Sequence, residues 1–225
     1  MRITLPSGTP AELCHPASGT ATRGLVLWPD VMGLRPLFEG HAQRLADAHG
    51  WSVCCVEVFP GAESSTMEER FALVASLRDI DKAADAVAAA AACGVDPVGV
   101  MGFCMGGMYA MKSLATHRFD RAVAFYGMVR IPEMWRAPEG AETVNHDAID
   151  SVHDRGDAEL MCIFGLRDPW CPIEEIDEVE AAGAVVIRYP DAEHGWAQDP
   201  SRDGYRADDA SDAWRRAEAF LAGAG

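Results

Sequence analysis

Residues 98–107 of the chain read VGVMGFCMGG, and this stretch decides the fold. A short apolar run passes directly into a glycine-rich turn, and an amphipathic stretch, 105–117, follows it. The form G-x-C-x-G between a buried strand and a helix is typical of a sharp turn that exposes a nucleophile. We therefore predict that Cys104 stands at a helix N-terminus, where the helix dipole favours a thiolate. The alternative is a buried cysteine beside a glycine-rich packing site.

Short apolar runs alternate with longer amphipathic stretches on both sides of this segment. This alternation predicts an α/β fold, in which a mostly parallel central sheet carries helices on both faces. Two polar-alternating runs, 2–5 and 12–15, predict an antiparallel edge pair. We predict further strands over 24–28, 51–58, 98–102, 122–126, 160–164 and 185–189, and helices over 36–48, 105–117, 174–182 and 207–222, with one or two more ending near residue 93.

The alternation fails over about 128–157, although a single domain over 1–225 accounts for the rest of the pattern. A loop of this length inside a compact domain is usually functional or mobile. Because it follows a parallel strand, it starts at the edge of the sheet where ligands bind. Two interpretations stay open: a lid over the site, or a surface excursion with a short helix.

Composition excludes several classes of protein. Hydrophobic residues make up 49% of the chain, which is enough for a core, while the net charge of −16 argues against nucleic acid or an anionic membrane as partner. No apolar stretch is long enough to span a bilayer, and residues 1–10 lack a signal-peptide core. Seven scattered cysteines without C-x-x-C spacing predict a reducing, cytoplasmic compartment. We expect no metal and no cofactor, because neither metal-ligand spacing nor a phosphate-binding glycine motif occurs. The oligomeric state stays open.

An acid and a histidine follow later apolar runs in the order that a nucleophile turn requires. Asp168 comes after the strand predicted over 160–164, and His194 comes after the last predicted strand. We predict that His194 accepts the thiol proton of Cys104 and later activates water, and that Asp168 holds the imidazole. The thiolate then attacks an ester or lactone carbonyl and forms a thioester, which water cleaves.

The oxyanion of this reaction needs two backbone N–H donors. One is expected from Met105, the residue after the nucleophile, and the other from the loop after the 24–28 strand, at Val31.

Four segments resemble the dienelactone hydrolase family: 29–34, 102–107, 165–170 and 192–196. The resemblance implies an α/β-hydrolase fold, a triad of Cys104, Asp168 and His194, and a small-molecule ester or lactone as substrate. The family also keeps an acidic residue, usually glutamate, after the first parallel strand, where it helps to activate the thiol. Asp30 stands there in this chain, one methylene shorter; its alternative role is to cap the turn.

Three departures from the family pattern point to a different substrate. Gln198 stands where a family arginine follows the triad histidine, and Arg70 corresponds only loosely to a second one; a solvated Arg70 paired with Glu68 or Glu69 is the alternative. The third departure is the long 128–157 stretch. The aromatic residues Tyr126, Trp135 and Trp196 suggest an apolar or aromatic group in the substrate.

Two other functions use the same residues. A thioesterase or acyltransferase would keep the triad and change the acceptor of the acyl group. A non-catalytic α/β-hydrolase-like binding protein would keep the triad idle.

Overall fold

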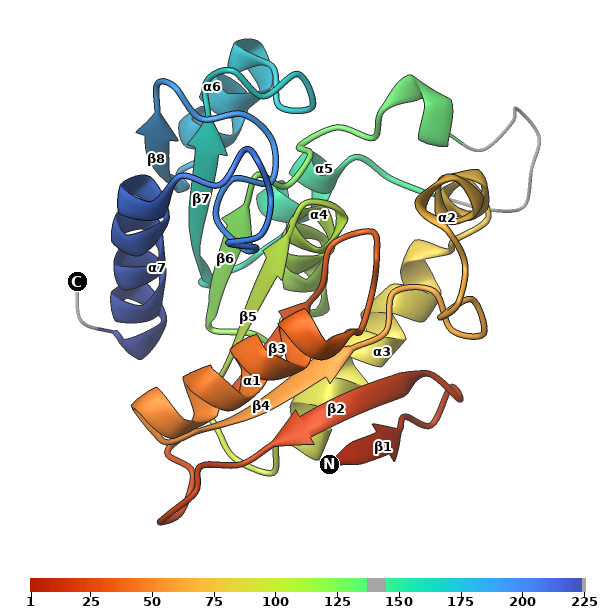
Figure 1. Ribbon diagram of the computed structural model, residues 1–225, viewed down its shortest axis with the longest axis vertical. Helices are drawn as coiled ribbons and strands as arrows, with labels where there is room; N and C mark the ends of the chain where they lie inside the picture. The colour runs from red at the N-terminus through yellow and green to blue at the C-terminus, as the bar shows by residue number, and fades with distance from the viewer. Residues whose placement is uncertain (137–144, 224–225) are drawn as a thin grey trace.

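The computed structural model describes residues 1–136 and 145–223. Eight strands form one sheet in the order β1-β2-β4-β3-β5-β6-β7-β8 (Figure 1). The strands are β1 (Arg2–Thr4), β2 (Pro10–Cys14), β3 (Arg23–Trp28), β4 (Trp51–Val56), β5 (Val98–Phe103), β6 (Arg121–Phe125), β7 (Glu159–Gly165) and β8 (Val185–Tyr189). Strands β3 to β8 pair in parallel, whereas β2 is antiparallel to both β1 and β4. The predicted mostly parallel sheet with an antiparallel edge pair is therefore confirmed.

Helices cover both faces of the sheet. They are α1 (Pro36–His49), α2 (Met67–Val74), α3 (Asp79–Ala92), α4 (Met105–Ser113), α5 (Ala148–His153), α6 (Ile173–Ala181) and α7 (Ala207–Ala222). Helices α1 and α7 lie on one face, where Arg44 pairs with Glu218 at 2.8 Å, and α3, α4 and α5 lie on the other (Figure 1). The chain moves toward one edge of the sheet from β3 to β4, and toward the other edge from β4 through β5 and β6 to β7. Right-handed crossovers therefore place α1 on one face and α3, α4 and α5 on the other.

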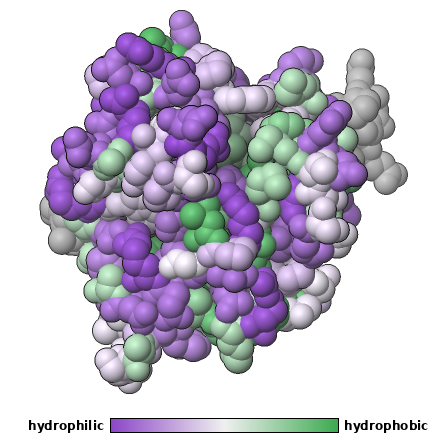
Figure 2. Space-filling model, in the orientation of Figure 1, coloured by the Kyte–Doolittle hydropathy of each residue, from purple (hydrophilic) through white to green (hydrophobic). Residues whose placement is uncertain are grey.

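The central strands consist of residues that are buried on both faces. Every residue of β3, β4 and β5 is buried, as expected of parallel strands between two helix layers. The surface is different: the face drawn in Figure 2 is mostly hydrophilic, with a small hydrophobic area near its centre. In the described residues, no helix is long and apolar enough to cross a membrane.

The 128–157 stretch is more regular than its sequence suggests. A 3-10 helix, η2 (Glu133–Trp135), begins it, and α5 packs Ala148, Ile149 and Val152 into the core beside α4. The six residues of α5 thus belong to the helix layer. The lid interpretation also involves residues 137–144, which lie outside the described residues, and it stays a prediction.

Candidate active site

Cys104 stands between β5 and α4 in a backbone conformation that side chains rarely adopt, with φ 57° and ψ −122°. The glycines around it allow this turn to form. A Cβ at Gly102 would lie 2.0 Å from the carbonyl oxygen of Gly106, and one at Gly106 would lie 2.1 Å from that of Pro29. Only glycine fits at either position, so the close approach expected of strand, turn and helix is present.

Asp168 and His194 meet at the same edge of the sheet. Asp168 follows β7, His194 follows β8, and Oδ2 of the aspartate lies 2.7 Å from Nδ1 of the imidazole. The second oxygen of Asp168 accepts the backbone N–H of Trp170 at 2.8 Å, which fixes the carboxylate. Burial alone lowers the pKa of His194. The electrostatic interaction with Cys104 and the hydrogen bond to Asp168 outweigh burial and raise that pKa to about 10.

Cys104 and His194 open onto one cavity of about 610 Å³. One wall is aromatic: the rings of Trp135 and Trp170 stack with their centroids 5.4 Å apart, and Phe71 packs against Trp135 at 5.5 Å. The remaining lining residues are Asp30, Val31, Met32, Arg35, Met67, Gln198, Asp199 and Arg202. Of the aromatic residues that the sequence singled out, only Trp135 lines this cavity. Trp170 and Phe71 were missed, although Trp170 follows Asp168 by only two residues.

Val31 and Met105, the residues predicted to donate to an oxyanion, flank Cys104 from two different loops or helix ends. Val31 lines the cavity from the loop after β3, and Met105 is the first residue of α4, where backbone donors have no partner inside the helix. Across residues 1–136 and 145–223, neither N–H donates a backbone hydrogen bond in a turn, loop or cap.

Asp30 is a buried carboxylate that is fully engaged. Its oxygens lie 2.6 and 2.9 Å from the guanidinium of Arg35 and accept the backbone N–H of Met32 and the side-chain amide of Gln198. No hydrogen bond joins Asp30 to Cys104 among the described residues. The geometry therefore agrees with the turn-capping role that the sequence left open for Asp30.

Arg70 is not solvated, so its expected pairing with Glu68 or Glu69 is wrong. Its side chain is 1% exposed and lies 3.3 Å from the carboxylate of Glu57, which is fully buried. Arg70 also donates to the backbone carbonyls of Val31, Glu63 and Ser65. It does not line the cavity. Glu57 falls at the end of an apolar run, so its sequence position does not suggest it as a partner for Arg70.

Tyr126 and Trp196 lie behind the cavity wall and do not line it. Both are fully buried. The hydroxyl of Tyr126 donates to the side-chain carbonyl of Gln198, and its ring meets that of His194 edge-on at 5.3 Å. These contacts support the histidine from behind, which is a packing role.

Two arginines line the cavity that the sequence analysis did not single out. Arg35 pairs with Asp30, and Arg202 packs over Gly195, where a Cβ would lie 2.8 Å from its guanidinium. Arg202 has no ion pair within the residues that the structure describes. The cavity therefore contains two guanidinium groups, although residue 198 is a glutamine and not an arginine.

The sheet order and the strained strand-to-helix turn define an α/β-hydrolase fold. The chain belongs to the dienelactone hydrolase family, whose model matches residues 10–224. It is 29% identical to a carboxymethylenebutenolidase from Rhodococcus opacus, over 96% of this chain and 87% of that protein.

Solved structures agree with this fold. A dienelactone hydrolase candidate from Klebsiella pneumoniae superposes with a TM-score of 0.84 at 23% identity, covering 99% of this chain and 97% of that one. A dienelactone hydrolase-like promiscuous phosphotriesterase from metagenomic libraries gives a TM-score of 0.75 at 20% identity, covering 99% and 96%. The chain is accordingly a hydrolase of this family.

Proposed function

We propose that this protein hydrolyses small carboxylic esters or lactones through a triad of Cys104, His194 and Asp168. One observation carries the proposal. The imidazole of His194 is held at 2.7 Å by Asp168 and shares one cavity with a cysteine in a strained turn. A nucleophile, a base and a group that orients the base are thus assembled around one space.

The reaction follows from the proton chemistry of these groups. The sulfur of Cys104 forms a bond to the carbonyl carbon while its proton resides on His194. The backbone N–H groups of Val31 and Met105 stabilise the oxyanion. When the carbon–oxygen bond of the substrate breaks, the imidazolium gives its proton to the leaving oxygen, and a thioester remains. Water, deprotonated by the imidazole, cleaves the thioester and regenerates the thiol.

The aromatic wall favours a substrate with a planar, apolar part. Trp170 and Phe71 are partly exposed at the cavity, and the buried Trp135 packs against both of them. Stacking of an aryl group on such rings contributes about 0.5–1.5 kcal/mol beyond the buried area. Esters that carry an aryl group are therefore expected to bind better than alkyl esters such as ethyl acetate.

The test compares the wild type with Cys104→Ala and Cys14→Ala on three substrates: p-nitrophenyl acetate, which carries an aryl group, ethyl acetate, which does not, and a neutral lactone. Cys14 is buried in β2 and serves as the matched control, because it loses a thiol away from the cavity. Loss of the nucleophile should lower kcat/KM by at least about 10³-fold, whereas the control keeps its activity.

Mass spectrometry of the quenched reaction distinguishes the alternatives. An acyl group on the peptide containing Cys104, followed by release of free acid, supports hydrolysis. Transfer of the acyl group only to an added alcohol or thiol, and not to water, supports an acyltransferase. Slow acylation without turnover supports a binding protein, and equal activity in Cys104→Ala refutes the triad.

A further inference from the structure

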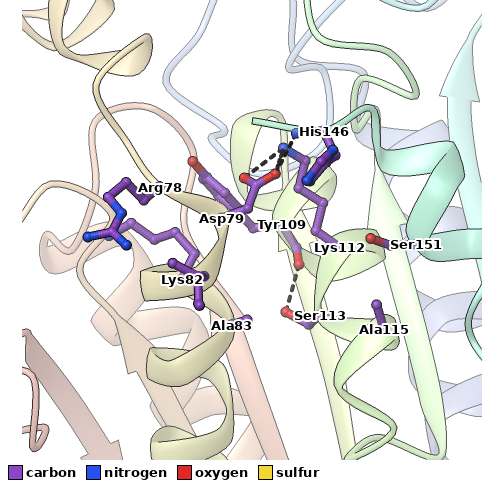
Figure 3. A pocket seen from close by; sticks show the side chains of 11 residues that line it. Arg78, Asp79, Lys82, Ala83, Tyr109, Lys112, Ser113, Ala115, His146 and Ser151 are labelled. Atoms are coloured by element: carbon purple, nitrogen blue, oxygen red, sulfur yellow. Dashed lines mark hydrogen bonds and ion pairs between the residues drawn. The ribbon is translucent and has the colours of Figure 1, made fainter. Parts of the chain in front are cut away.

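A second cavity, of about 490 Å³, lies between α3, α4 and α5. It shares no lining residue with the cavity at Cys104. Figure 3 shows its side chains: Arg78 and Lys82 come from the α3 side, Tyr109 and Lys112 from α4, and His146 and Ser151 from the segment around α5. Nothing in the proposed esterase chemistry uses these residues.

Lysine is rare in this chain and concentrated at this cavity. The sequence contains two lysines against 17 arginines, and both lysines line the cavity. Both are buried, Lys82 with 5% and Lys112 with 8% of its surface exposed, although lysine is among the residues least often buried. Together with Arg78, the two lysines outnumber Asp79, the one carboxylate among the described residues that line the cavity, so the lining carries a net positive charge.

The two lysines differ in what neutralises them. Lys112 is fully paired, because its ammonium lies 2.9 and 3.0 Å from the two carboxylate oxygens of Asp79. Lys82 has no such partner: its ion pair with Asp85 spans 3.9 Å, and within the described part of the chain its ammonium makes no hydrogen bond.

Asp85 cannot easily approach Lys82. Its two oxygens already accept the hydroxyls of Ser7 and Thr9, at 2.5 and 2.9 Å. Burial lowers the pKa of Lys82, which shows the cost of keeping its charge inside the protein. An anion in the cavity would offset this cost and supply the missing acceptor.

We propose that this cavity is a binding site for a small organic anion, whose carboxylate or phosphate contacts Lys82 and Arg78. The guanidinium of Arg78 stands at the same cavity and is 58% exposed, so it can turn toward the anion. Ile80, Ala83 and Ala115 supply apolar surface for the body of the ligand. A cavity of this volume, mostly apolar with a few polar groups, has the character of a small-molecule site.

The rarity of lysine provides the experiment. Labelling with 13Cε-lysine gives two side-chain NMR signals, and Lys82→Met identifies which one belongs to Lys82. The wild type is titrated with benzoate, phenyl phosphate and the neutral benzyl alcohol. We expect the Lys82 signal to move with either anion and to stay in place with the alcohol; the anion that binds more tightly identifies the headgroup.

Calorimetry then compares the variants. Lys82→Met should weaken binding of the better anion by roughly 10- to 100-fold, the range expected for a charge-assisted hydrogen bond. Arg215→Met, which removes an exposed charge from α7, and Arg202→Met, which alters the cavity at Cys104, should leave the affinity unchanged.

Two results would overturn the proposal. One is a Lys82 signal that neither anion moves, and the other is an affinity that depends on Arg202 instead of Lys82. The titration of the wild type decides the matter even where Lys82→Met is poorly folded, because both lysines line this cavity and two unmoved lysine signals exclude binding there. Because binding is measured without turnover, the result is independent of the proposed esterase activity.

Discussion

Gly106→Ala tests whether the close approach of α4 to the loop after β3 is required. The new Cβ would lie 2.1 Å from the carbonyl oxygen of Pro29 and 2.3 Å from that of Trp28. Both neighbours are backbone atoms, so no side chain can rotate away, and the helix or the loop must move by about 1 Å. Overpacking of this kind costs about 3 kcal/mol, while alanine in place of glycine returns up to about 1 kcal/mol of helix propensity. The net expectation is a loss of about 2 kcal/mol.

Thermal unfolding followed by circular dichroism measures this loss. For a chain of this length, 2 kcal/mol corresponds to a Tm about 4–8 °C lower. Gly40→Ala is the matched control, because Gly40 lies within α1 and a Cβ there meets nothing within 4 Å. It should raise Tm by about 2–4 °C through helix propensity alone. A Gly106→Ala protein that unfolds at the wild-type temperature would refute the steric argument.

Four further predictions concern single groups. Arg70→Met should cost about 3–5 kcal/mol in urea unfolding, because it leaves the buried Glu57 without its partner. Because the pKa of His194 is raised in the folded state, its charged form stabilises that state fully below the unfolded pKa, near 6.5, and this stabilisation is lost as pH rises toward 10. In urea titrations, the free energy of unfolding should therefore fall more between pH 6 and pH 10 for the wild type than for His194→Gln. Trp170→Leu should raise KM for p-nitrophenyl acetate by roughly two- to tenfold and leave that for ethyl acetate unchanged. Arg202→Met should lower the preference for a carboxylated over a neutral lactone by roughly tenfold, and an unchanged ratio would exclude it as the anion contact.

The fold was predictable from the sequence because parallel strands that are buried on both faces are nearly continuous apolar runs. The strand predicted over 98–102 ends one residue later, at Phe103, and the turn at Cys104 follows from the apolar run and the glycine spacing together. Position along the chain also predicted that Asp168 and His194 meet, since the carboxyl ends of parallel strands lie at one edge. The structure places these two side chains at hydrogen-bond distance.

Other parts of the site depend on distant pairings that one sequence does not contain. Arg70 looks like a surface arginine beside two glutamates, and its burial against Glu57 arises only when α2 packs beside the segment that follows β4. Trp135 and Phe71 are 64 positions apart, yet their rings are in contact. The helix at 148–153 is too short for its hydrophobic periodicity to be recognised in the sequence.

The hydrogen bonds of the neighbouring side chains explain why residue 198 is a glutamine. Its amide group donates to Asp30 and its carbonyl accepts from Tyr126, so it connects a carboxylate with a hydroxyl. Arginine has no acceptor and could not replace it, because the buried hydroxyl would then lose its partner. The positive charge that Asp30 requires comes from Arg35, five residues along the chain. The absence of arginine at 198 is therefore a consequence of local bonding, and the substrate's charge must be inferred from Arg202, whose guanidinium faces the cavity without an ion pair among the described residues.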